Sequence, residues 1–474
     1  MLFNSITFIF FLAIVLVLHY SPLSWSAKKS NLLIASYLFY AAWNPYFVLL
    51  LLMSTLLDWK VAARIYASAN PRERKFWLVI SLLVNLGALA FFKYTNFLMA
   101  NLVVVAEAAG ISFAWQENSI VLPMGISFYT FQTISYSMDV YRGKMKPWNS
   151  LKDYALYVSF FPQLVAGPIV RSNEFLPQCV EPKTFDGKGF SVGLTLLLIG
   201  LMEKVFLADS VFAPLVDSVF QTEQVPDAMS AWAASYFFTM QIFCDFAGYS
   251  LCAIGTAKCL GFRLPFNFNS PFAATGFSNF WTRWHISLSS WLRDYLYISL
   301  GGNRLGRSKT LRNLMLTMAL GGLWHGAKWP MIIWGIYHGV LLIAERLIQN
   351  RASRPLAAPG VIRTFAARVV TLFLIVVSFT IFRSDDITQV GTMLSVMFGL
   401  SAGEVTILSM NLAFKIAVAA SLALLSVQYI WHNKEIIGVV QNSNFLVRGL
   451  GLAACVILIV ISTGQSDGFI YFQF

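Results

Sequence analysis

Apolar stretches recur along almost the whole chain, and no other feature of the sequence constrains the fold as strongly. Of the 474 residues, 57% are hydrophobic and only 12% are charged, whereas a soluble domain carries about 25% charged residues. A helix needs about 20 apolar residues to cross a bilayer. Several stretches are shorter or are interrupted by Gly and Pro, which predicts tilted, broken or re-entrant helices. The sequence therefore predicts an all-α polytopic membrane protein with about 11–13 membrane segments.

Positively charged residues cluster in short segments between the apolar stretches, and the net charge is +12. The clusters are Lys28–Lys29, Arg64–Lys75, Arg304–Arg312 and Arg346–Arg354. Because loops rich in Lys and Arg stay on the cytoplasmic side, we interpret them as topology signals in a lipid bilayer, with no nucleic-acid partner. An external N-terminus and a turn at Asn44–Pro45 make this pattern consistent. Met1–Tyr20 lacks a basic start and a small-residue cleavage site, so we expect a retained first helix.

The sequence shows no long Ser, Pro or Gly linker and no repeat of fixed period, which predicts one domain over residues 1–474. The five cysteines form no CxxC pair, and we expect them to be buried as small apolar residues. No HExxH motif or carboxylate cluster suggests a metal, so we predict no metal ion and no bound cofactor. The sequence also lacks a GxSxG elbow, a P-loop and a dinucleotide-binding fingerprint.

One polar region, from Phe266 to Lys328, interrupts the apolar pattern. Polar groups near membrane depth are costly and usually face a cavity or a partner. Within it, Phe277–Asp294 holds four ionisable side chains among five aromatic ones, namely Arg283, His285, Arg293 and Asp294. An amphipathic helix at the membrane interface is one interpretation, and a segment that lines a site is another. The two interpretations can coexist.

His325 lies at the end of an apolar stretch, in the sequence Gly-Gly-Leu-Trp-His-Gly-Ala. Small residues on both sides let the backbone and a substrate approach closely. A neutral imidazole in a low-dielectric pocket can accept a hydroxyl proton at physiological pH, which suits activation of an alcohol for attack on a thioester. A hydrogen-bonded structural histidine explains the residue type equally well. The flanking glycines, Trp324 and the polar region upstream favour a functional residue.

His285 is the candidate partner of His325. It could orient His325, polarise an acyl carbonyl or hydrogen-bond a substrate, and the sequence does not distinguish these roles. His338 follows Pro330, which is expected to start a new helix. We therefore interpret His338 as a packing residue.

Eight motifs in a fixed order resemble the membrane-bound O-acyltransferase family, and specifically its branch of alginate O-acetyltransferases. The motifs are Leu122–Phe128 (LPMGISF), Ser135–Arg142 (SYSMDVYR), Phe161–Pro168 (FPQLVAGP), Asp245–Ser250 (DFAGYS), Phe280–Ser289 (FWTRWHISLS), Trp291–Tyr295 (WLRDY), Leu300–Arg304 (LGGNR) and Gly322–Gly326 (GLWHG). This resemblance defines a motif-bearing core over residues 1–348, whereas residues 349–474 diverge.

The resemblance implies a ring of tilted and partly re-entrant helices around a central tunnel that connects the two membrane faces. It maps the catalytic histidine of the family onto His325 and a second functional position onto His285. We expect seven further residues to line the tunnel or to contact substrate. They are Trp324, Asp294, Arg293, Trp284, Asn279, Asp245 and Tyr249.

The family transfers an acyl group from a thioester donor to a hydroxyl or an amine, so the resemblance implies an O-acyltransferase. We expect acetyl transfer from a cytoplasmic donor, acetyl-CoA or another acyl thioester, across a bacterial cytoplasmic (inner) membrane. The expected acceptor is an exported polysaccharide. Transfer would be direct or would pass through an extracytoplasmic SGNH-type partner that works with a glycan synthase complex.

Two other activities stay open at this point. D-alanyl transfer from a carrier protein to teichoic acid belongs to a related branch, which shares the Asp-Phe-Ala-Gly-Tyr-Ser and Arg-Trp-His motifs. That branch generally lacks the Leu-Gly-Gly-Asn-Arg stretch and differs in its first third, which favours acetyl transfer here. A transporter or channel lined by the polar region is the third activity, although the chain shows no internal two-fold repeat.

Overall fold

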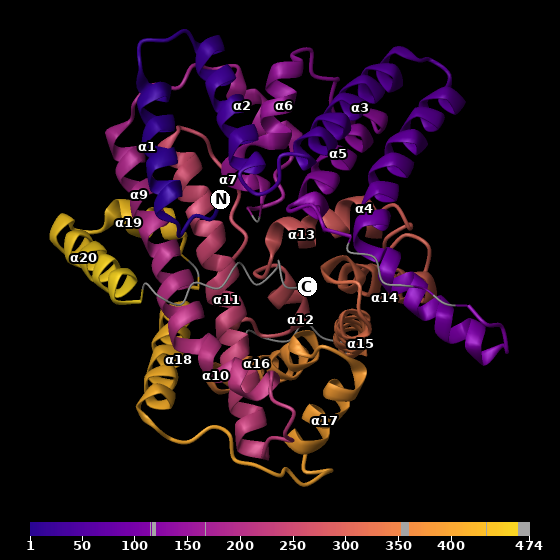
Figure 1. Ribbon diagram of the computed structural model, residues 1–474, viewed down its shortest axis with the longest axis vertical. Helices are drawn as coiled ribbons and strands as arrows, with labels where there is room; N and C mark the ends of the chain where they lie inside the picture. Colours follow the sequence, from indigo (N-terminus) through magenta and orange to yellow (C-terminus); the bar gives the residue numbers. More distant parts are fainter. Residues whose placement is uncertain (114, 116–119, 166, 352–359, 433, 463–474) are drawn as a thin grey trace. The chain divides into compact units, whose positions relative to one another are not determined.

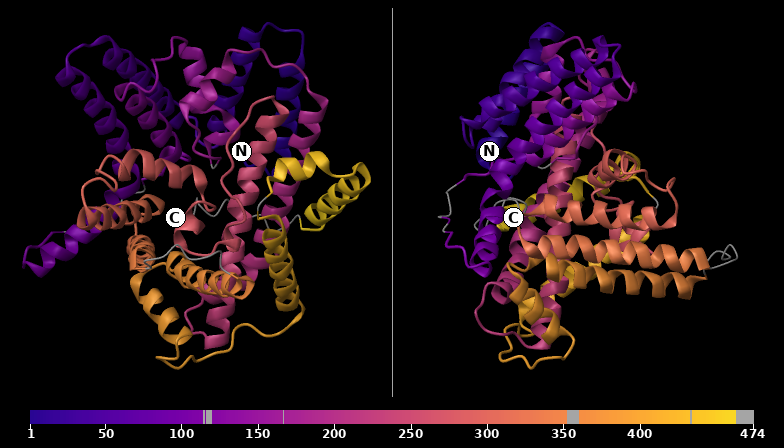
Figure 2. Two further views of the ribbon diagram at one scale, coloured as in Figure 1. Left: turned by 180° about the vertical axis from the view of Figure 1, so that it is seen from behind. Right: turned by 90° about the vertical axis from the view of Figure 1, so that its right-hand side faces the viewer.

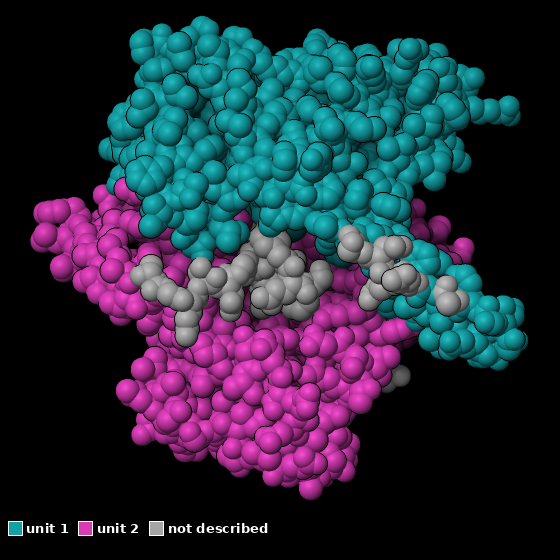
Figure 3. All heavy atoms as spheres, in the orientation of Figure 1, with its two compact units in different colours: residues 1–193, 253–265 teal, residues 194–252, 266–474 magenta. Residues whose placement is uncertain are grey.

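The computed structural model describes residues 1–113, 115, 120–165, 167–351, 360–432 and 434–462, and these residues form helices without a β-strand (Figures 1 and 2). They group into two compact units (Figure 3). Unit 1 comprises residues 1–193 and 253–265, and unit 2 comprises residues 194–252 and 266–474. Residues 352–354 of the predicted basic segment and Ala166 of the third motif lie outside the described residues.

Unit 1 contains the helices of the N-terminal part of the chain. Their bounds are α1 (Ile6–Tyr20), α2 (Trp25–Ala41), α3 (Phe47–Ala67), α4 (Pro71–Ala108), α5 (Ile126–Tyr141), α6 (Leu151–Ser159), α7 (Phe161–Leu164), α8 (Ser172–Phe175) and η1 (Leu176–Cys179). Helix α9 (Gly187–Leu201) begins in unit 1 and ends in unit 2, and α11 (Ala228–Cys259) does the reverse. The turn predicted at Asn44–Pro45 lies between α2 and α3, as expected.

Unit 2 contains the remaining helices. Their bounds are η2 (Met202–Phe212), α10 (Ala213–Phe220), η3 (Pro271–Ala273), α12 (Phe277–Trp281), α13 (Ile286–Trp291), η4 (Leu292–Tyr297), α14 (Arg307–His325), α15 (Trp329–Arg351), α16 (Val361–Arg383), α17 (Ile387–Met397), α18 (Leu412–Trp431), α19 (Ile436–Asn442) and α20 (Phe445–Ile461). Segments η2 and η4 are π-helices, a rare form that is frequent at functional sites. Within this unit, α14, α15 and α16 run side by side (Figure 2).

Six helical segments of the described chain are long and apolar enough to cross a membrane. They are α4, residues 187–220 (α9 through α10), α11, residues 329–349 of α15, α16 and α18. The bent pair α19 and α20 would make a seventh span, and α1 and α17 are shorter apolar helices. The prediction of an all-α, multi-pass membrane protein is therefore confirmed.

A buried carboxylate connects helices α3, α4 and α5 of unit 1. Asp58 is fully buried and accepts hydrogen bonds from the Ser81 hydroxyl at 2.5 Å, the Ser137 hydroxyl at 2.7 Å and the Asn85 amide at 2.6 Å. The amide oxygen of Asn85 in turn accepts from Ser54 at 2.8 Å. A buried carboxylate is costly unless hydrogen bonds satisfy it. The network therefore favours the one packing of these helices that brings all its donors together.

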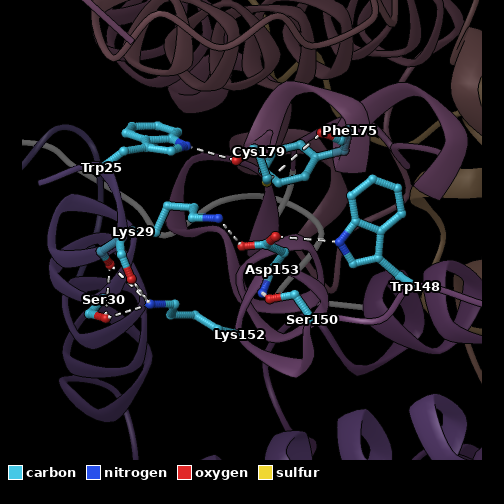
Figure 4. A network of polar contacts seen from close by, with 10 residues as sticks. Trp25, Lys29, Ser30, Trp148, Ser150, Lys152, Asp153, Phe175 and Cys179 are labelled. Carbon is cyan, nitrogen blue, oxygen red and sulfur yellow. Dashed lines mark hydrogen bonds and ion pairs between the residues drawn. The ribbon is translucent and has the colours of Figure 1, made fainter. Parts of the chain in front are cut away.

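An ion pair connects α2 to α6 within unit 1 (Figure 4). The Nζ atom of Lys29 lies 2.5 Å from Oδ1 of Asp153, and both side chains are largely buried. Trp148 donates to the other carboxylate oxygen at 3.4 Å, and Ser150 caps α6 by accepting from the Asp153 backbone N–H. Lys29 therefore belongs to a helix that packs inside unit 1. The prediction that Lys28 and Lys29 lie in a loop is therefore wrong, because both residues lie in α2.

Unit 2 is built around an aromatic core. Its buried rings include Phe212 of η2, Phe238 of α11, Trp334 of α15, and Phe379 and Phe382 of α16. Helices distant in sequence meet in this core. Close packing in a membrane protein stabilises mainly through van der Waals contact, because lipid is as apolar as the side chains. Helices α16, α17 and α18, which follow residue 349, thus belong to the same core as the motif-bearing part of unit 2.

Asn85→Ala should destabilise unit 1. The substitution removes one donor from the buried Asp58 carboxyl group and the acceptor for Ser54, so a polar group stays buried with fewer partners. We expect a loss of about 2 kcal/mol, measured as a lower thermal unfolding midpoint of the detergent-solubilised protein.

Asn101→Ala is the matched control, because Asn101 lies on the same helix, is half-buried and donates to the Phe97 carbonyl of that helix at 2.7 Å. If the unfolding midpoint fell equally in both variants, the special role of the Asp58 network would be contradicted.

Candidate functional site

His325 lies at the turn between two helices. As predicted, the apolar helix α14 ends at His325, and the next residue, Gly326, is extended. Helix α15 begins at Trp329 with Pro330 in its first turn, where the missing N–H of proline is tolerated. The side chain of His325 is buried, with 4% of its surface exposed.

Glycines let α14 and α15 approach each other closely beside His325. A Cβ atom on Gly322 would collide with the carbonyl oxygen of Met331 and would lie 3.0 Å from the Cα atom of Gly335. A Cβ atom on Gly335 would in turn collide with the carbonyl oxygen of Met318. Such an approach of two backbones is open only to glycine. The prediction that small residues let the backbone approach closely at this place is confirmed for Gly322.

Three aromatic rings surround the His325 imidazole. The ring centroids of Trp324, Trp334 and Phe382 lie 5.1, 5.1 and 5.4 Å from it, with interplanar angles of 75°, 87° and 75°. The three rings come from α14, α15 and α16. Edge-to-face contacts of this kind are favourable and directional, so they hold the imidazole in one orientation.

His285 is held in an unusual backbone conformation before α13. Its φ and ψ angles are 43° and 53°, in the left-handed region that non-glycine residues rarely adopt. The side chain is completely buried, and neither ring nitrogen has a hydrogen-bond partner among the described residues. Burial lowers the pKa of this imidazole, which lies outside the candidate membrane spans, to about 3, so the ring is neutral at physiological pH. Backbone strain and an unpaired buried polar group both suggest a functional residue.

Asn267 holds the backbone next to His285. Its carbonyl oxygen accepts from the Ile286 N–H at 2.9 Å, and its side-chain Oδ1 accepts from the Ser287 hydroxyl at 2.6 Å and from the Ser287 N–H at 3.3 Å. Its Nδ2 donates to the Ser250 hydroxyl of α11 at 3.1 Å. These bonds anchor the first residues of α13 to α11 and stabilise the left-handed turn.

The two imidazoles lie near each other. The ring centroids of His285 and His325 are 6.3 Å apart, with an interplanar angle of 50°. The Trp324 ring contacts both, at 5.1 Å from His325 and 6.1 Å from His285. Phe246 of α11 packs edge-on against His285 at 4.6 Å. The structure therefore brings His325, His285 and Trp324, three of the predicted site residues, into one cluster.

Four other predicted residues lie in different surroundings. Trp284 is buried in the aromatic core and stacks on Phe280 at 5.5 Å. Arg293 and Asp294 on η4 pair with each other at 2.8 Å, and the Arg293 side chain is 64% exposed, a setting in which an ion pair contributes little. Asn279 accepts a hydrogen bond from the guanidinium of Arg283 at 3.2 Å.

Asp245 belongs to a buried ionic cluster. Lys204 of the π-helix η2 lies 2.8 Å from Asp209 and also pairs with Asp245 of α11, and all three side chains are almost completely buried. Two carboxyl groups thus contact one ammonium group. Tyr249, one turn after Asp245, is buried on the same helix. Charged groups inside a membrane domain are costly and are usually retained for a specific packing or a function.

The structure also places His338 and the cysteines. His338 is completely buried and its Nε2 lies 2.8 Å from the Ser378 hydroxyl, in agreement with its interpretation as a packing residue. Four of the five cysteines are buried, and Cys455 is half-buried. Within the described part of the chain, no three His, Cys, Asp or Glu side chains are grouped as metal ligands.

Sequence reasoning missed three residues of this site, Asn267, Trp334 and Phe382. Asn267 lies in the polar region, so its polarity was a signal, but nothing in the sequence tied it to His285. Trp334 lies one helical turn before His338 on α15, a spacing typical of core packing. Phe382 comes from the part of the chain for which no motif was identified.

The chain is similar to a known protein family and to several proteins of named activity. A model described as "MBOAT, membrane-bound O-acyltransferase family" matches residues 147–384, a region that includes His285, His325 and Phe382. The chain is 42% identical over 418 residues to the protein named "Probable alginate O-acetylase AlgI" in Azotobacter vinelandii, covering 87% of this chain and 81% of that protein. It is 35% identical to the "Peptidoglycan O-acetyltransferase" of Helicobacter pylori, covering 85% and 80%.

A weaker similarity links the chain to a third kind of protein. It is 27% identical over 248 residues to the "Teichoic acid D-alanyltransferase" of Bacillus subtilis, covering 49% of this chain and 61% of that protein. The similarity to the two acetylation proteins therefore extends over much more of the chain.

Gly322→Ala should separate α14 from α15 and destabilise the protein. The new methyl group would collide with backbone atoms of Met331 and Gly335, which cannot move aside as a side chain can. We expect a loss of about 2 kcal/mol, measured as a lower thermal unfolding midpoint in detergent.

Gly321→Ala is the matched control, because a Cβ atom there meets only the end of the Leu292 side chain, at 3.1 Å. Alanine also favours the helix over glycine by about 1 kcal/mol, so this variant should be nearly neutral. Equal losses at positions 321 and 322 would show that the close backbone approach is not what Gly322 provides.

Proposed function

Because the chain belongs to the membrane-bound O-acyltransferase family, we propose that this O-acyltransferase transfers acetyl groups to the hydroxyls of an exported polysaccharide. One observation carries the choice of acetyl and polysaccharide. Proteins named for O-acetylation of alginate and of peptidoglycan are 42% and 35% identical to this chain and cover 87% and 85% of it. A shared activity is the simplest reason for similarity that extends over so much of the chain.

We assign the role of general base to His325. An imidazole nitrogen takes the proton of the acceptor hydroxyl while the hydroxyl oxygen attacks the thioester carbonyl, and a C–O bond forms. The C–S bond of the tetrahedral intermediate then breaks, and the thiol leaves with the proton from the imidazolium. A positioned base of this kind contributes about 10²–10⁴ in rate. The buried aromatic surroundings of His325 support this role, because excluding water limits hydrolysis of the thioester.

We propose that the His285 side chain contacts the acyl carbonyl group that reacts. Its ring centroid lies 6.3 Å from that of His325, and its nitrogens have no hydrogen-bond partner among the described residues. A hydrogen bond that orients His325 directly is therefore not part of its role in this conformation. A neutral imidazole can donate one hydrogen bond, which would stabilise the developing oxyanion of the carbonyl. Of the roles considered from the sequence, polarisation of the acyl carbonyl fits this geometry best.

The architecture proposed for this reaction is a single domain over residues 1–474 with about 11–13 membrane segments around a tunnel. The proposed location is the cytoplasmic membrane of a bacterium, because the similar proteins named above are bacterial. The proposed donor is acetyl-CoA or another cytoplasmic acyl thioester. The acetyl group passes directly to the polysaccharide or to an extracytoplasmic SGNH-type partner that works with a glycan synthase.

D-alanyl transfer to teichoic acid is the weaker alternative. The teichoic acid D-alanyltransferase of Bacillus subtilis is only 27% identical to this chain, and the similarity covers 49% of it. The genes next to the coding gene separate the two activities: an SGNH-type protein and a glycan synthase indicate acetyl transfer, and a D-alanine ligase with a small carrier protein indicates D-alanyl transfer. A transporter or channel is disfavoured by membership of an acyltransferase family.

His325→Ala should abolish O-acetylation of the surface polysaccharide, because it removes the base that activates the acceptor. The measurement is the acetyl content of purified polysaccharide from cells with the variant, compared with wild type and a deletion strain. An immunoblot of the membrane fraction controls for protein amount. Full acetylation by the variant at normal abundance would contradict the assignment of His325 as the general base. His285→Ala should be nearly as damaging, and a mild effect would make His285 structural.

Asn267→Ala should reduce acetyl transfer about tenfold, because it frees the turn that positions His285. Asn267→Asp keeps the acceptor for Ser287 and should recover part of the rate. The matched control is Asn269→Ala, since Asn269 is the same residue type two positions later with an exposed side chain. Equal activity of the Asn267→Ala and Asn269→Ala variants would contradict the positioning role.

A further inference from the structure

A polar cavity of about 600 Å³ lies in unit 2. Neither His285 nor His325 lines it, so it is a second feature of the same unit. Its lining includes two guanidinium groups, one carboxylate, and side chains with further hydrogen-bond donors. These residues are Arg283, Arg368, Glu345, Gln349, Thr282 and His432. The volume lies within the range of about 300–1,000 Å³ that small-molecule sites occupy.

Arg283 is held in place at this cavity. Its Nε donates to Asn279 at 3.2 Å, and its Nη1 donates to the carbonyl oxygens of Asn269 and His432, both at 3.1 Å. A guanidinium has five N–H donors, and Nη2 has no partner among the described residues. The side chain is therefore pre-oriented and still has donors for a ligand.

Arg368 of α16 contributes a second, less satisfied guanidinium. It lies over the ring of Tyr429 at 5.2 Å, and its buried Nε has no hydrogen-bond partner within the described ranges. Burial of the Arg283 guanidinium and, after it, the positive charge of Arg368 lower the pKa of Arg283. The two guanidinium groups line one cavity and carry like charges that repel each other, so an anion bound between them would relieve the repulsion.

The carboxylate of Glu345 already accepts hydrogen bonds from other groups of the protein. One of its oxygens accepts from the backbone N–H groups of Phe277 and Ser278, at 2.7 and 3.0 Å, and the other accepts from Gln349 at 2.9 Å. It therefore caps the beginning of α12. Among the ionised residues of the lining, two arginines stand against this one carboxylate, so the cavity favours an anion.

We propose that this cavity binds a phosphate-ester group. Arginine pairs are suited to phosphate because each planar guanidinium can donate two parallel hydrogen bonds to its oxygens. Thr282, Gln349 and His432 offer further polar contacts. A polar lining of this kind does not suit an acyl chain, and the volume exceeds what a lone phosphate needs. The ligand is therefore a phosphate ester with a sizeable polar portion.

The surrounding charges indicate the membrane face on which the cavity opens. Arg346 follows Glu345 on α15, and Arg363 precedes Arg368 on α16. Such a concentration of arginines at helix ends indicates the cytoplasmic side. Phosphate esters on that side have two sources: the coenzyme A portion of a thioester donor, and the headgroup of an anionic phospholipid.

The position of the cavity along α15 favours the thioester donor as the source of the phosphate ester. Trp334, which contacts His325, and Glu345, which lines the cavity, are eleven residues apart on this helix, or about 16 Å along its axis. An elongated donor could place its phosphates in the cavity and direct its thioester towards the histidines. This choice of source rests on the proposed acetyl transfer, whereas phosphate binding does not.

Arg368→Gln tests the proposal by direct binding. Coenzyme A is titrated calorimetrically into the purified full-length protein in detergent, without acetyl group or acceptor. We expect binding to weaken about tenfold or more, the effect of losing charge-assisted hydrogen bonds. The matched control is Arg363→Gln, because Arg363 is exposed on the same helix and does not line the cavity. Arg368→Lys keeps the positive charge but loses the planar guanidinium group, so it should weaken binding less. This variant keeps the proposal testable if the glutamine variant does not fold.

A second arm tests the lipid source. The thermal midpoint of the protein is measured in nanodiscs of phosphatidylglycerol and of phosphatidylcholine. Stabilisation by phosphatidylglycerol that Arg368→Gln removes and Arg363→Gln retains would assign the site to a phospholipid headgroup. If Arg368→Gln and Arg363→Gln behave alike in both arms, the phosphate site is refuted. His325→Ala should bind coenzyme A normally, so failure of the acetyl-transfer proposal and failure of the phosphate site give different results.

Discussion

The requirement that buried polar groups find partners governs the interior of this apolar chain. Water is not available inside a membrane domain to replace a missing partner. Asp58 therefore collects its donors from α4 and α5, and Lys204 lies between Asp209 and Asp245. Each such network is satisfied in one arrangement of its helices, so polar side chains select the packing among many apolar alternatives of similar energy. His285, with both ring nitrogens unpaired, is one of several departures from this rule among the described residues.

Close backbone packing and aromatic packing act together around His325. Gly322 and Gly335 bring α14 and α15 within a distance that no side chain permits, and this places Trp334 against the imidazole. Phe382 of α16 adds a further ring. The orientation of His325 therefore depends on three helices. A base must be held within a fraction of an ångström of its working position, and rigid helices do this better than a loop.

Hydropathy was sufficient to predict the all-helical, multi-pass fold, because crossing a bilayer imposes a length and a composition that a single sequence displays. The helix end at His325 and the new helix at Pro330 were also predictable from local rules. The hydrogen bonds of Asn267 to Ser287 and Ser250 were not, since they join segments whose proximity only the tertiary fold creates. The left-handed conformation of His285 was unpredictable for the same reason, as no local signal favours it over an ordinary turn.

The surroundings of His325 and the polar cavity, both in unit 2, differ in polarity. This difference matches the two chemical groups that we propose they bind. Around His325 the neighbours include three aromatic rings, which would leave a thioester few competing partners and little water. At the cavity, Arg283 and Arg368 keep donors available that the protein does not satisfy. Charged phosphates would be unstable in the first environment, and a thioester would gain nothing from the second. A donor that carries both groups is therefore best bound across both, with each end in the environment that matches its charge.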